Sequence, residues 1–150
     1  ELEELLSIQG AELLVETIPR YVSGALRGYP QDHSKATMAP RLRKDDSPID
    51  WNRTARELHN QVRAYNPWPG SSTTVRGQSL KVWRSRLIQL QAPGCPGEML
   101  RISPVGLQVR CGEGSVLELV EVQLPGRARV AAGALANGLK LKAGERFGQD

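Results

Sequence analysis

The alternation of polar and apolar residues from Ser71 to Gln123 is the feature that most restricts how this chain can fold. Successive side chains of a β-strand point to opposite faces, so a period of two predicts strands. The runs with this period are STTV, SLKVWRSRLIQL, EMLRIS, GLQVRC and SVLELVEVQL, separated by turn signals at Gly77, Pro93–Gly97, Pro104–Gly106 and Gly112–Gly114. No helical pattern lies between consecutive runs. We therefore expect a mainly β fold, in the form of a small antiparallel barrel, of which the oligonucleotide-binding (OB) type is one option among several.

A helical pattern covers residues 1–28. Leu2, Leu5 and Leu6 share one face, and Ala11, Leu14, Val15, Ile18 and Val22 share another. We expect Gly10 to separate two helices, and we expect Pro19 to kink or end the second, because proline lacks the amide donor. A helix of this kind is not stable alone, so we expect its apolar face to pack on a sheet that this chain does not contain.

A second helix is predicted from Asn52 to Asn66. Asn52 can cap its first turn, and Pro67 disfavours a helical conformation at the residue before it. Its apolar stripe consists of Ala55, Leu58, Val62 and Tyr65. Nearer the C-terminus, VAAGALANGL predicts one short helix that Gly133 weakens, and LKLKAGERFG predicts a last pair of strands.

The second helix is followed by the stretch NPWPG, in which Trp68 lies between Pro67 and Pro69. The two prolines leave this tryptophan few conformations to lose, so it can be presented at low entropic cost. We expect Trp68 to be a packing anchor between helix and barrel, and the alternative is a platform on which an RNA base stacks. Trp51 and Asn66 complete this predicted structural junction.

Charge is distributed unevenly along the chain. Residues 1–52 carry six Lys and Arg against nine Asp and Glu, whereas residues 53–150 carry 14 against seven. The net charge is therefore −3 in the first part, +7 in the second and +4 overall. A basic region suits a polyanionic partner such as nucleic acid, although solvated arginines on the strands would give the same composition.

The sequence indicates little catalytic chemistry. His33 and His59 have no Cys, Asp or Glu at metal-ligand spacing, and neither is placed as a base beside a nucleophile. Cys95 and Cys111 are too far apart for a zinc motif, and we expect both to be reduced. Gly112–Gly114 predicts a β-turn, since no helix follows it. The apolar runs are too short for a bilayer and no leader pattern is present, so we expect neither membrane insertion nor export.

Several longer motifs are similar to the C-terminal half of methionyl-tRNA formyltransferase. They are KATMAPRLRKDDSPIDW, LHNQVRAYNPWPG, GQSLKVWRSRLI, APGCPGEML, GLQVRCGEGSVLELVEVQLPG and LKAGERFG, and they keep the order and spacing of that family between Leu5 and Gly148. IDW followed by RAYNPWPG is the most specific part. The resemblance implies that residues 1–30 are the last helices of a Rossmann-like catalytic formyltransferase domain, residues 31–48 a linker, and residues 49–150 an OB-like C-terminal barrel domain.

The resemblance also implies a reaction. The family transfers a formyl group from 10-formyltetrahydrofolate to the α-amino group of methionine on initiator tRNA. Its catalytic Asn, His and Asp and its folate loop lie upstream of the matched segment. We therefore expect no catalytic, cofactor or metal site in this chain, which would be inactive alone, and we expect a missing N-terminal catalytic domain before Glu1.

Within this resemblance, the chain is expected to position the acceptor arm of initiator tRNA, with no role for DNA. The residues predicted to contact RNA phosphates are Arg41, Arg43 and Lys44 on the linker and Lys81, Arg84, Arg86, Arg127 and Arg129 on the barrel. Where the family tends to have GKK or GKR followed by MSA, this chain has GRAR followed by VAAG, a departure that concerns the contacts near Arg127. The expected compartment is the cytoplasm, or an organellar matrix in a eukaryote.

Two alternatives stay open. Formyltransferases that act on the amino group of a nucleotide sugar have a related C-terminal barrel and a similar PWPG, and their basic surface would meet a diphosphate. The linker cluster together with IDW favours the tRNA enzyme. The other alternative is a stand-alone RNA-binding module, which the helical pattern that opens at Glu1 disfavours, because its apolar face would be exposed.

Overall fold

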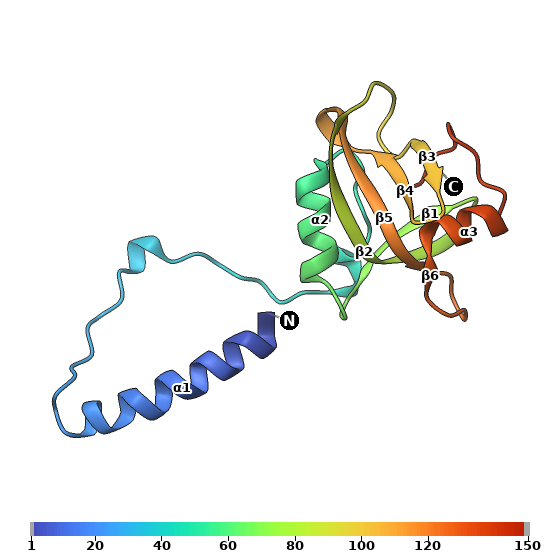
Figure 1. The fold of residues 1–150 in the computed structure, drawn as a ribbon. Helices are drawn as coiled ribbons and strands as arrows, with labels where there is room; N and C mark the ends of the chain where they lie inside the picture. Colours follow the sequence, from blue (N-terminus) through green and yellow to red (C-terminus); the bar gives the residue numbers. More distant parts are fainter. Residues whose placement is uncertain (1, 149–150) are drawn as a thin grey trace. The chain divides into compact units, whose positions relative to one another are not determined.

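The structure is a computed structural model that describes residues 2–148. It divides into two compact units, residues 1–40 and residues 41–150, which we describe separately (Figure 1). The division lies inside the predicted linker of residues 31–48, so the basic residues Arg41, Arg43 and Lys44 belong to the second unit. Within residues 2–148, no helix is both long enough and apolar enough to cross a membrane.

The first unit consists mainly of one helix, α1 (Leu2–Val22). The predicted break at Gly10 is wrong, because a single glycine costs a helix only about 1 kcal/mol and the flanking residues are good helix formers. Pro19 also lies inside α1, which continues to Val22. None of the described side chains of α1 is buried. The apolar residues of this helix are therefore exposed to solvent in this chain.

The second unit is built on a six-stranded antiparallel sheet. Its strands are β1 (Ser71–Val75), β2 (Gln78–Gln91), β3 (Met99–Ser103), β4 (Gly106–Arg110), β5 (Ser115–Gln123) and β6 (Val130–Ala131). Their order is β1-β2-β5-β4-β3, and β6 pairs with β5. Each run with a period of two forms a strand, and the turns fall at the predicted Gly and Pro positions. The mainly β class is confirmed.

The predicted OB-like barrel is not confirmed, because the sheet does not close. β1 and β3 are the ends of the sheet path, and within residues 2–148 no ladder joins them. The C-terminal segment reaches both ends instead: Phe147 N donates to Gly97 O at 2.9 Å, and Gly148 N donates to Thr74 O at 3.0 Å. Strand pairing thus leaves the sheet open between β1 and β3, and the irregular C-terminal segment lies between these two edges.

The predicted last pair of strands is also wrong. The described part of the segment after Leu139 makes one isolated bridge, between Glu98 and Arg146. Lys140 has φ 52° and Gly144 has φ 91°, values in the left-handed region that interrupt an extended strand. The segment is instead held by hydrogen bonds to Met99, whose N donates to Glu145 O at 2.8 Å and whose O accepts from Gly144 N at 2.8 Å.

Two helices cover the sheet (Figure 1). α2 (Ala55–Ala64) packs on β2 and β5, and α3 (Ala132–Gly138) packs on β3, β4, β5 and β6. The largest fully buried side chains of the core between them are Leu58, Val62, Val75, Leu80, Val82, Met99, Val109, Cys111, Val116, Leu117, Leu119 and Val122. The α2 stripe was predicted correctly at Ala55, Leu58 and Val62, whereas Tyr65 is only partly buried.

Thr54, and not the predicted Asn52, caps α2. Thr54 Oγ1 accepts from Glu57 N at 3.3 Å, and Glu57 Oε2 accepts from Thr54 N at 2.9 Å, which is a capping box. The hydrogen bonds from Thr54 hold the pKa of Glu57 below its usual value. Asn52 Nδ2 donates to Asp50 Oδ1 at 2.8 Å in the preceding turn, so its side chain is committed there.

Both cysteines are free: Cys95 is exposed and Cys111 is buried. Burial raises the pKa of the Cys111 thiol to about 12, so this thiol is neutral at physiological pH. Gly112–Gly114 forms a 3-10 turn, with Glu113 at φ 56°, and leads directly into β5.

Candidate nucleic-acid interface

Two of the predicted RNA-binding residues meet on one tryptophan. Lys81 Nζ lies 4.0 Å from the centroid of the Trp83 ring, and Arg129 Cζ lies 3.4 Å from it. Lys81 and Trp83 are two residues apart in β2 and therefore project from the same face of the strand. Arg129 comes from the connection that precedes β6. Cation–π contacts contribute about 0.5–1 kcal/mol each at exposed sites, so the ring holds both cations in place.

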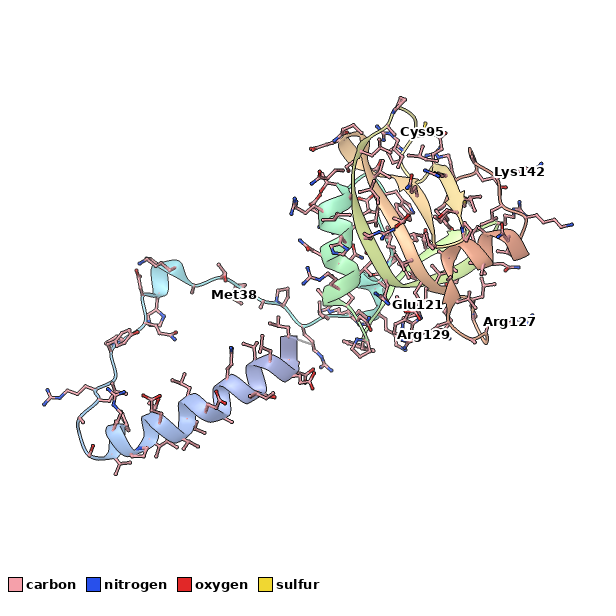
Figure 2. The ribbon with its side chains drawn as sticks, in the orientation of Figure 1. Met38, Cys95, Glu121, Arg127, Arg129 and Lys142 are labelled. Atoms are coloured by element: carbon pink, nitrogen blue, oxygen red, sulfur yellow. The ribbon has the colours of Figure 1, made fainter. Side chains whose placement is uncertain are left out.

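Gln123 fixes the connection from β5 to β6 against this tryptophan. Trp83 Nε1 donates to Gln123 Oε1 at 2.8 Å, and Gln123 Nε2 donates to Arg127 O at 2.7 Å. Arg127 and Arg129 are both exposed on this connection (Figure 2). The fold thus brings Lys81, Arg127 and Arg129 to one place, which we call the Trp83 cluster.

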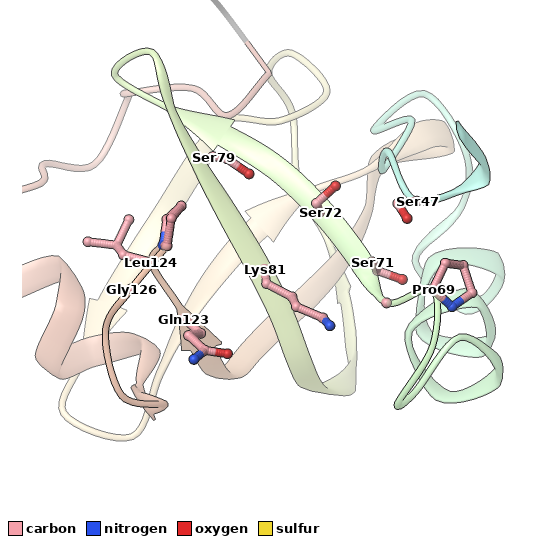
Figure 3. A pocket seen from close by; sticks show the side chains of 11 residues that line it. Ser47, Pro69, Ser71, Ser72, Ser79, Lys81, Gln123, Leu124 and Gly126 are labelled. Atoms are coloured by element: carbon pink, nitrogen blue, oxygen red, sulfur yellow. The ribbon is translucent and has the colours of Figure 1, made fainter. Parts of the chain in front are cut away.

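A cavity of about 360 Å³ opens beside Lys81 (Figure 3). Its walls come from the turn before Pro48, from β1 and β2, and from the end of β5 with the turn that follows. The lining residues are Ser47, Pro69, Gly70, Ser71, Ser72, Ser79, Lys81, Gln123, Leu124, Pro125 and Gly126. Lys81 is the only charged residue of this lining, so the cavity has a positive potential.

Arg84 and Arg86 lie at a different place, a cavity of about 500 Å³ that His59, Ser85, Leu87, Val105 and Val120 also line. Arg86 is bound to a carboxylate there: its Nε donates to Glu118 Oε2 at 2.7 Å, and its Nη2 donates to the same oxygen. Glu118 is 3% exposed. The charge of Arg86 therefore already balances a buried acid.

His59 lines the same cavity and contacts a hydroxyl group there. Its Nδ1 lies 2.9 Å from Ser85 Oγ. Burial, and then the nearby charge of Arg63, lower the pKa of His59. This pair resembles a base beside a hydroxyl group, but within residues 2–148 no carboxylate contacts the histidine to orient it as a base.

The three basic residues of the predicted linker form their own exposed group. Arg41, Arg43 and Lys44 are all exposed, and a 3-10 turn (Lys44–Asp46) follows Arg43. Asp46 Oδ2 accepts from Arg43 N at 2.7 Å, which fixes this turn. Ser47, the next residue, lines the cavity beside Lys81. The chain that carries this basic group therefore leads directly to the edge of the cavity.

The predicted junction divides into one buried and one exposed tryptophan. Trp51 is 5% exposed, its Nε1 donates to Thr73 Oγ1 at 3.0 Å, and its ring stacks on Phe147 with centroids 5.6 Å apart. Trp68 is 52% exposed, so the prediction that it is a packed anchor is wrong for this chain. Trp51 is the buried tryptophan of the junction. Asn66 does join helix to sheet, because its Nδ2 donates to Trp83 O at 3.3 Å.

Sequence reasoning missed Trp83, Gln123 and the serines around Lys81. A signal was available for Trp83, since Lys81 and Trp83 share a face at the period of two. Gln123 could not be found in this way, because its role depends on the pairing of β2 with β5. Within residues 2–148, no group of three His, Cys, Asp or Glu side chains is placed to hold a metal ion.

The second unit is an antiparallel sheet that carries the basic Trp83 cluster on its surface. Residues 41–140 match the family described as formyl transferase, C-terminal domain, and the chain belongs to this family. The matched region begins where the second compact unit begins.

Relatives of the chain include proteins named methionyl-tRNA formyltransferase. The one from Solibacter usitatus is 45% identical over 149 residues, which are 99% of this chain and 47% of that protein. The one from Bacillus subtilis is 37% identical over 147 residues, which are 98% of this chain and 46% of that protein. The resemblance seen in the sequence motifs is confirmed. The chain spans about half the length of the curated relatives that it matches.

A solved structure shares the fold. HypX from Aquifex aeolicus, crystallised in complex with tetrahydrofolic acid, matches with a TM-score of 0.62 and 15% sequence identity, over 89% of this chain and 24% of that chain. At this identity the likeness concerns the fold alone.

Proposed function

We propose that this chain is the tRNA-positioning C-terminal part of a methionyl-tRNA formyltransferase. Such an enzyme transfers a formyl group from 10-formyltetrahydrofolate to the amino group of methionine on initiator tRNA. The observation that carries the proposal is the 45% identity, over 99% of the chain, to a protein of that name. The catalytic domain is then the other half of the longer protein, and this chain alone is inactive.

The charge of the second unit supports the positioning role. Residues 41–150 carry 17 Lys and Arg against ten Asp and Glu, a net charge of +7. The Trp83 cluster and the exposed group of Arg41, Arg43 and Lys44 offer cations that are free to neutralise phosphates. Such contacts orient an RNA on the protein without reading its bases, as is required of a module that presents the acceptor arm to a separate catalytic domain.

We assign no folate contact to this chain. The pterin ring of 10-formyltetrahydrofolate presents adjacent N–H donors that a carboxylate accepts. Neither of the two cavities has an Asp or Glu in its lining. The residues present do not fit this co-substrate, which in our proposal binds the catalytic half of the enzyme.

The salt dependence of tRNA binding tests the positioning role. The full chain is titrated into fluorescently labelled initiator tRNA at several KCl concentrations, and the binding constant is obtained from anisotropy. If four phosphates are neutralised, affinity should fall by roughly a hundredfold between 50 and 200 mM salt. Binding that barely changes over this range would contradict the electrostatic role.

A second measurement tests the enzyme assignment. The longer protein, with the sequence that precedes Glu1, is expected to formylate methionyl-tRNA when supplied with 10-formyltetrahydrofolate, and the present chain is expected not to. Formyl transfer by the present chain alone would contradict the assignment of catalysis to the other half.

A further inference from the structure

The cavity beside Lys81 combines one cation with a wall of hydroxyl groups. Ser47, Ser71, Ser72 and Ser79 all contribute to its lining, and no Asp or Glu does (Figure 3). Ammonium and hydroxyl groups are the side-chain donors that phosphate oxygens accept from, and a carboxylate in the lining would repel an anion. The composition of this wall therefore favours an anion over a cation or an apolar ligand.

The pairing of three neighbouring strands places these groups at one level. Lys81 in β2 is paired with Ser72 of β1 on one side and with Gln123 of β5 on the other. Paired residues project from the same face of an antiparallel sheet, and so does Ser79, two residues before Lys81. On this face of the sheet, Lys81 therefore lies between the Ser72 side chain of β1 and the Gln123 side chain of β5.

Lys81 is partly buried and lacks a carboxylate partner. It belongs to none of the ion pairs within residues 2–148. Its side chain passes over Gly70, where a Cβ atom would collide with Lys81 Cε. Gly70 has φ 86°, a conformation that glycine adopts without strain. The absence of a side chain at Gly70 therefore leaves room for the Lys81 side chain. Because Lys81 forms no ion pair within residues 2–148, its ammonium group can bind an anion.

The opposite wall is rigid before any ligand arrives. Both polar atoms of the Gln123 amide are engaged, with Trp83 Nε1 and with Arg127 O, and Arg127 N donates to Leu124 O at 3.1 Å in the turn that closes the cavity. Ser71 also borders this cavity, but it is paired with Val82, so its buried side chain projects from the face opposite to Lys81.

We propose that this cavity is a binding pocket for one internal phosphate of the RNA backbone. The Lys81 ammonium neutralises the phosphate charge, and the hydroxyl groups of the serine wall donate to its oxygens. Arg127 and Arg129, which belong to the same Trp83 cluster, contact the phosphates that follow along the RNA strand. This inference rests on the proposed function, and it identifies which of the basic residues holds a phosphate in a formed site.

The variant Lys81→Gln, made in the full chain, tests the pocket. The affinity for an RNA hairpin that carries a 5′-hydroxyl group is measured against salt concentration. Loss of one phosphate contact should lower affinity several-fold and reduce the slope of log K against log salt by about 0.9. Lys142→Gln removes the same charge at an exposed position outside the cavity and is expected to leave the slope unchanged.

A titration with inorganic phosphate gives a readout that does not depend on RNA. In ¹H–¹⁵N spectra of the full chain, phosphate is expected to shift the amide signals of Ser72, Lys81 and Gly126, and chloride is not. The shifts should be absent in Lys81→Gln. Ser79→Ala, at an exposed position, should weaken them without disturbing the packing of Lys81, and it serves as the second variant if Lys81→Gln unfolds.

The outcomes separate this inference from the proposed function. If the wild-type chain binds RNA but Lys81→Gln keeps the wild-type slope, the pocket is wrong and the tRNA-positioning role stands. If Lys81→Gln weakens binding only for a hairpin with a 5′-phosphate, the pocket takes a terminal phosphate and the inference is overturned. If the wild-type chain binds no RNA at low salt, the proposed function itself fails.

Discussion

At the scale of single residues, Glu118 is a buried carboxylate whose charge one arginine balances. Arg86 reaches it from the neighbouring strand, and the arginine side chain is itself 61% exposed. Arg86→Gln would leave the buried acid without its cation. We expect the free energy of unfolding at pH 7 to fall by about 1–3 kcal/mol, measured by urea denaturation.

Arg84→Gln is the matched control, because Arg84 is exposed on the same strand and forms no ion pair within residues 2–148. We expect it to change the free energy of unfolding by no more than about 0.5 kcal/mol. Equal losses for the two variants would show that Glu118 does not depend on Arg86.

Of the two tryptophans of the predicted junction, Trp51 is buried and Trp68 is half exposed. Trp68→Ala should change the free energy of unfolding by no more than about 0.5 kcal/mol, because the side chain is half exposed. Trp51→Phe should cost about 1 kcal/mol or more, since it removes the hydrogen bond to Thr73 and part of the stacking on Phe147. Thermal denaturation of both variants decides this, and a larger loss for Trp68→Ala would restore the packing-anchor hypothesis.

At the scale of elements, Gly133 has a packing role that helix propensity hides. The glycine was expected to weaken α3, yet a Cβ atom at this position would collide with the backbone of Ser103 and Pro104. Gly133→Ala should therefore destabilise the protein by about 1–3 kcal/mol, although alanine is the better helix former. Gly138→Ala is the control: it lies at the end of the same helix with no atom within 4 Å, and it should be neutral or slightly stabilising. Chemical denaturation of both variants measures the difference.

The elements themselves could be read from the sequence wherever the signal is local. The strands follow from the period of two, and the ends of α2 and β1 follow from Pro67 and Gly77. The errors arose where a local signal was weak or a partner came from another element. Gly10 lies within a continuous helix because one glycine costs too little to break it, and Glu118 is buried on β5 beside Arg86 of β2, a pairing that the sequence does not show.

At the scale of the whole molecule, the candidate site could be predicted only in part. Net charge and resemblance led to a basic surface and to Lys81 and Arg129, because both signals are present in the linear sequence. The cavity was not predictable, since Ser47, Ser72 and Gly126 approach one another only through the pairing of β1, β2 and β5. The pairing of β2 with β5 also places Arg86 beside Glu118, so Arg86 forms an ion pair and differs in this from Lys81 and Arg129.

The exposed apolar residues of α1 lead to a prediction about the longer protein. A 21-residue helix without a buried side chain is only marginally stable in water. In the present chain, the amides of α1 should exchange with solvent within seconds, whereas those of β5 should be protected to the limit set by global unfolding. The expectation for the longer protein rests on the proposed function. There the other half would cover Leu6, Leu13 and Leu14, so the amides of α1 should become protected from exchange while the protection of β5 stays unchanged. Hydrogen exchange followed by mass spectrometry compares the two proteins directly. Strong protection of α1 in the present chain would mean that the helix does not depend on the missing half for its stability.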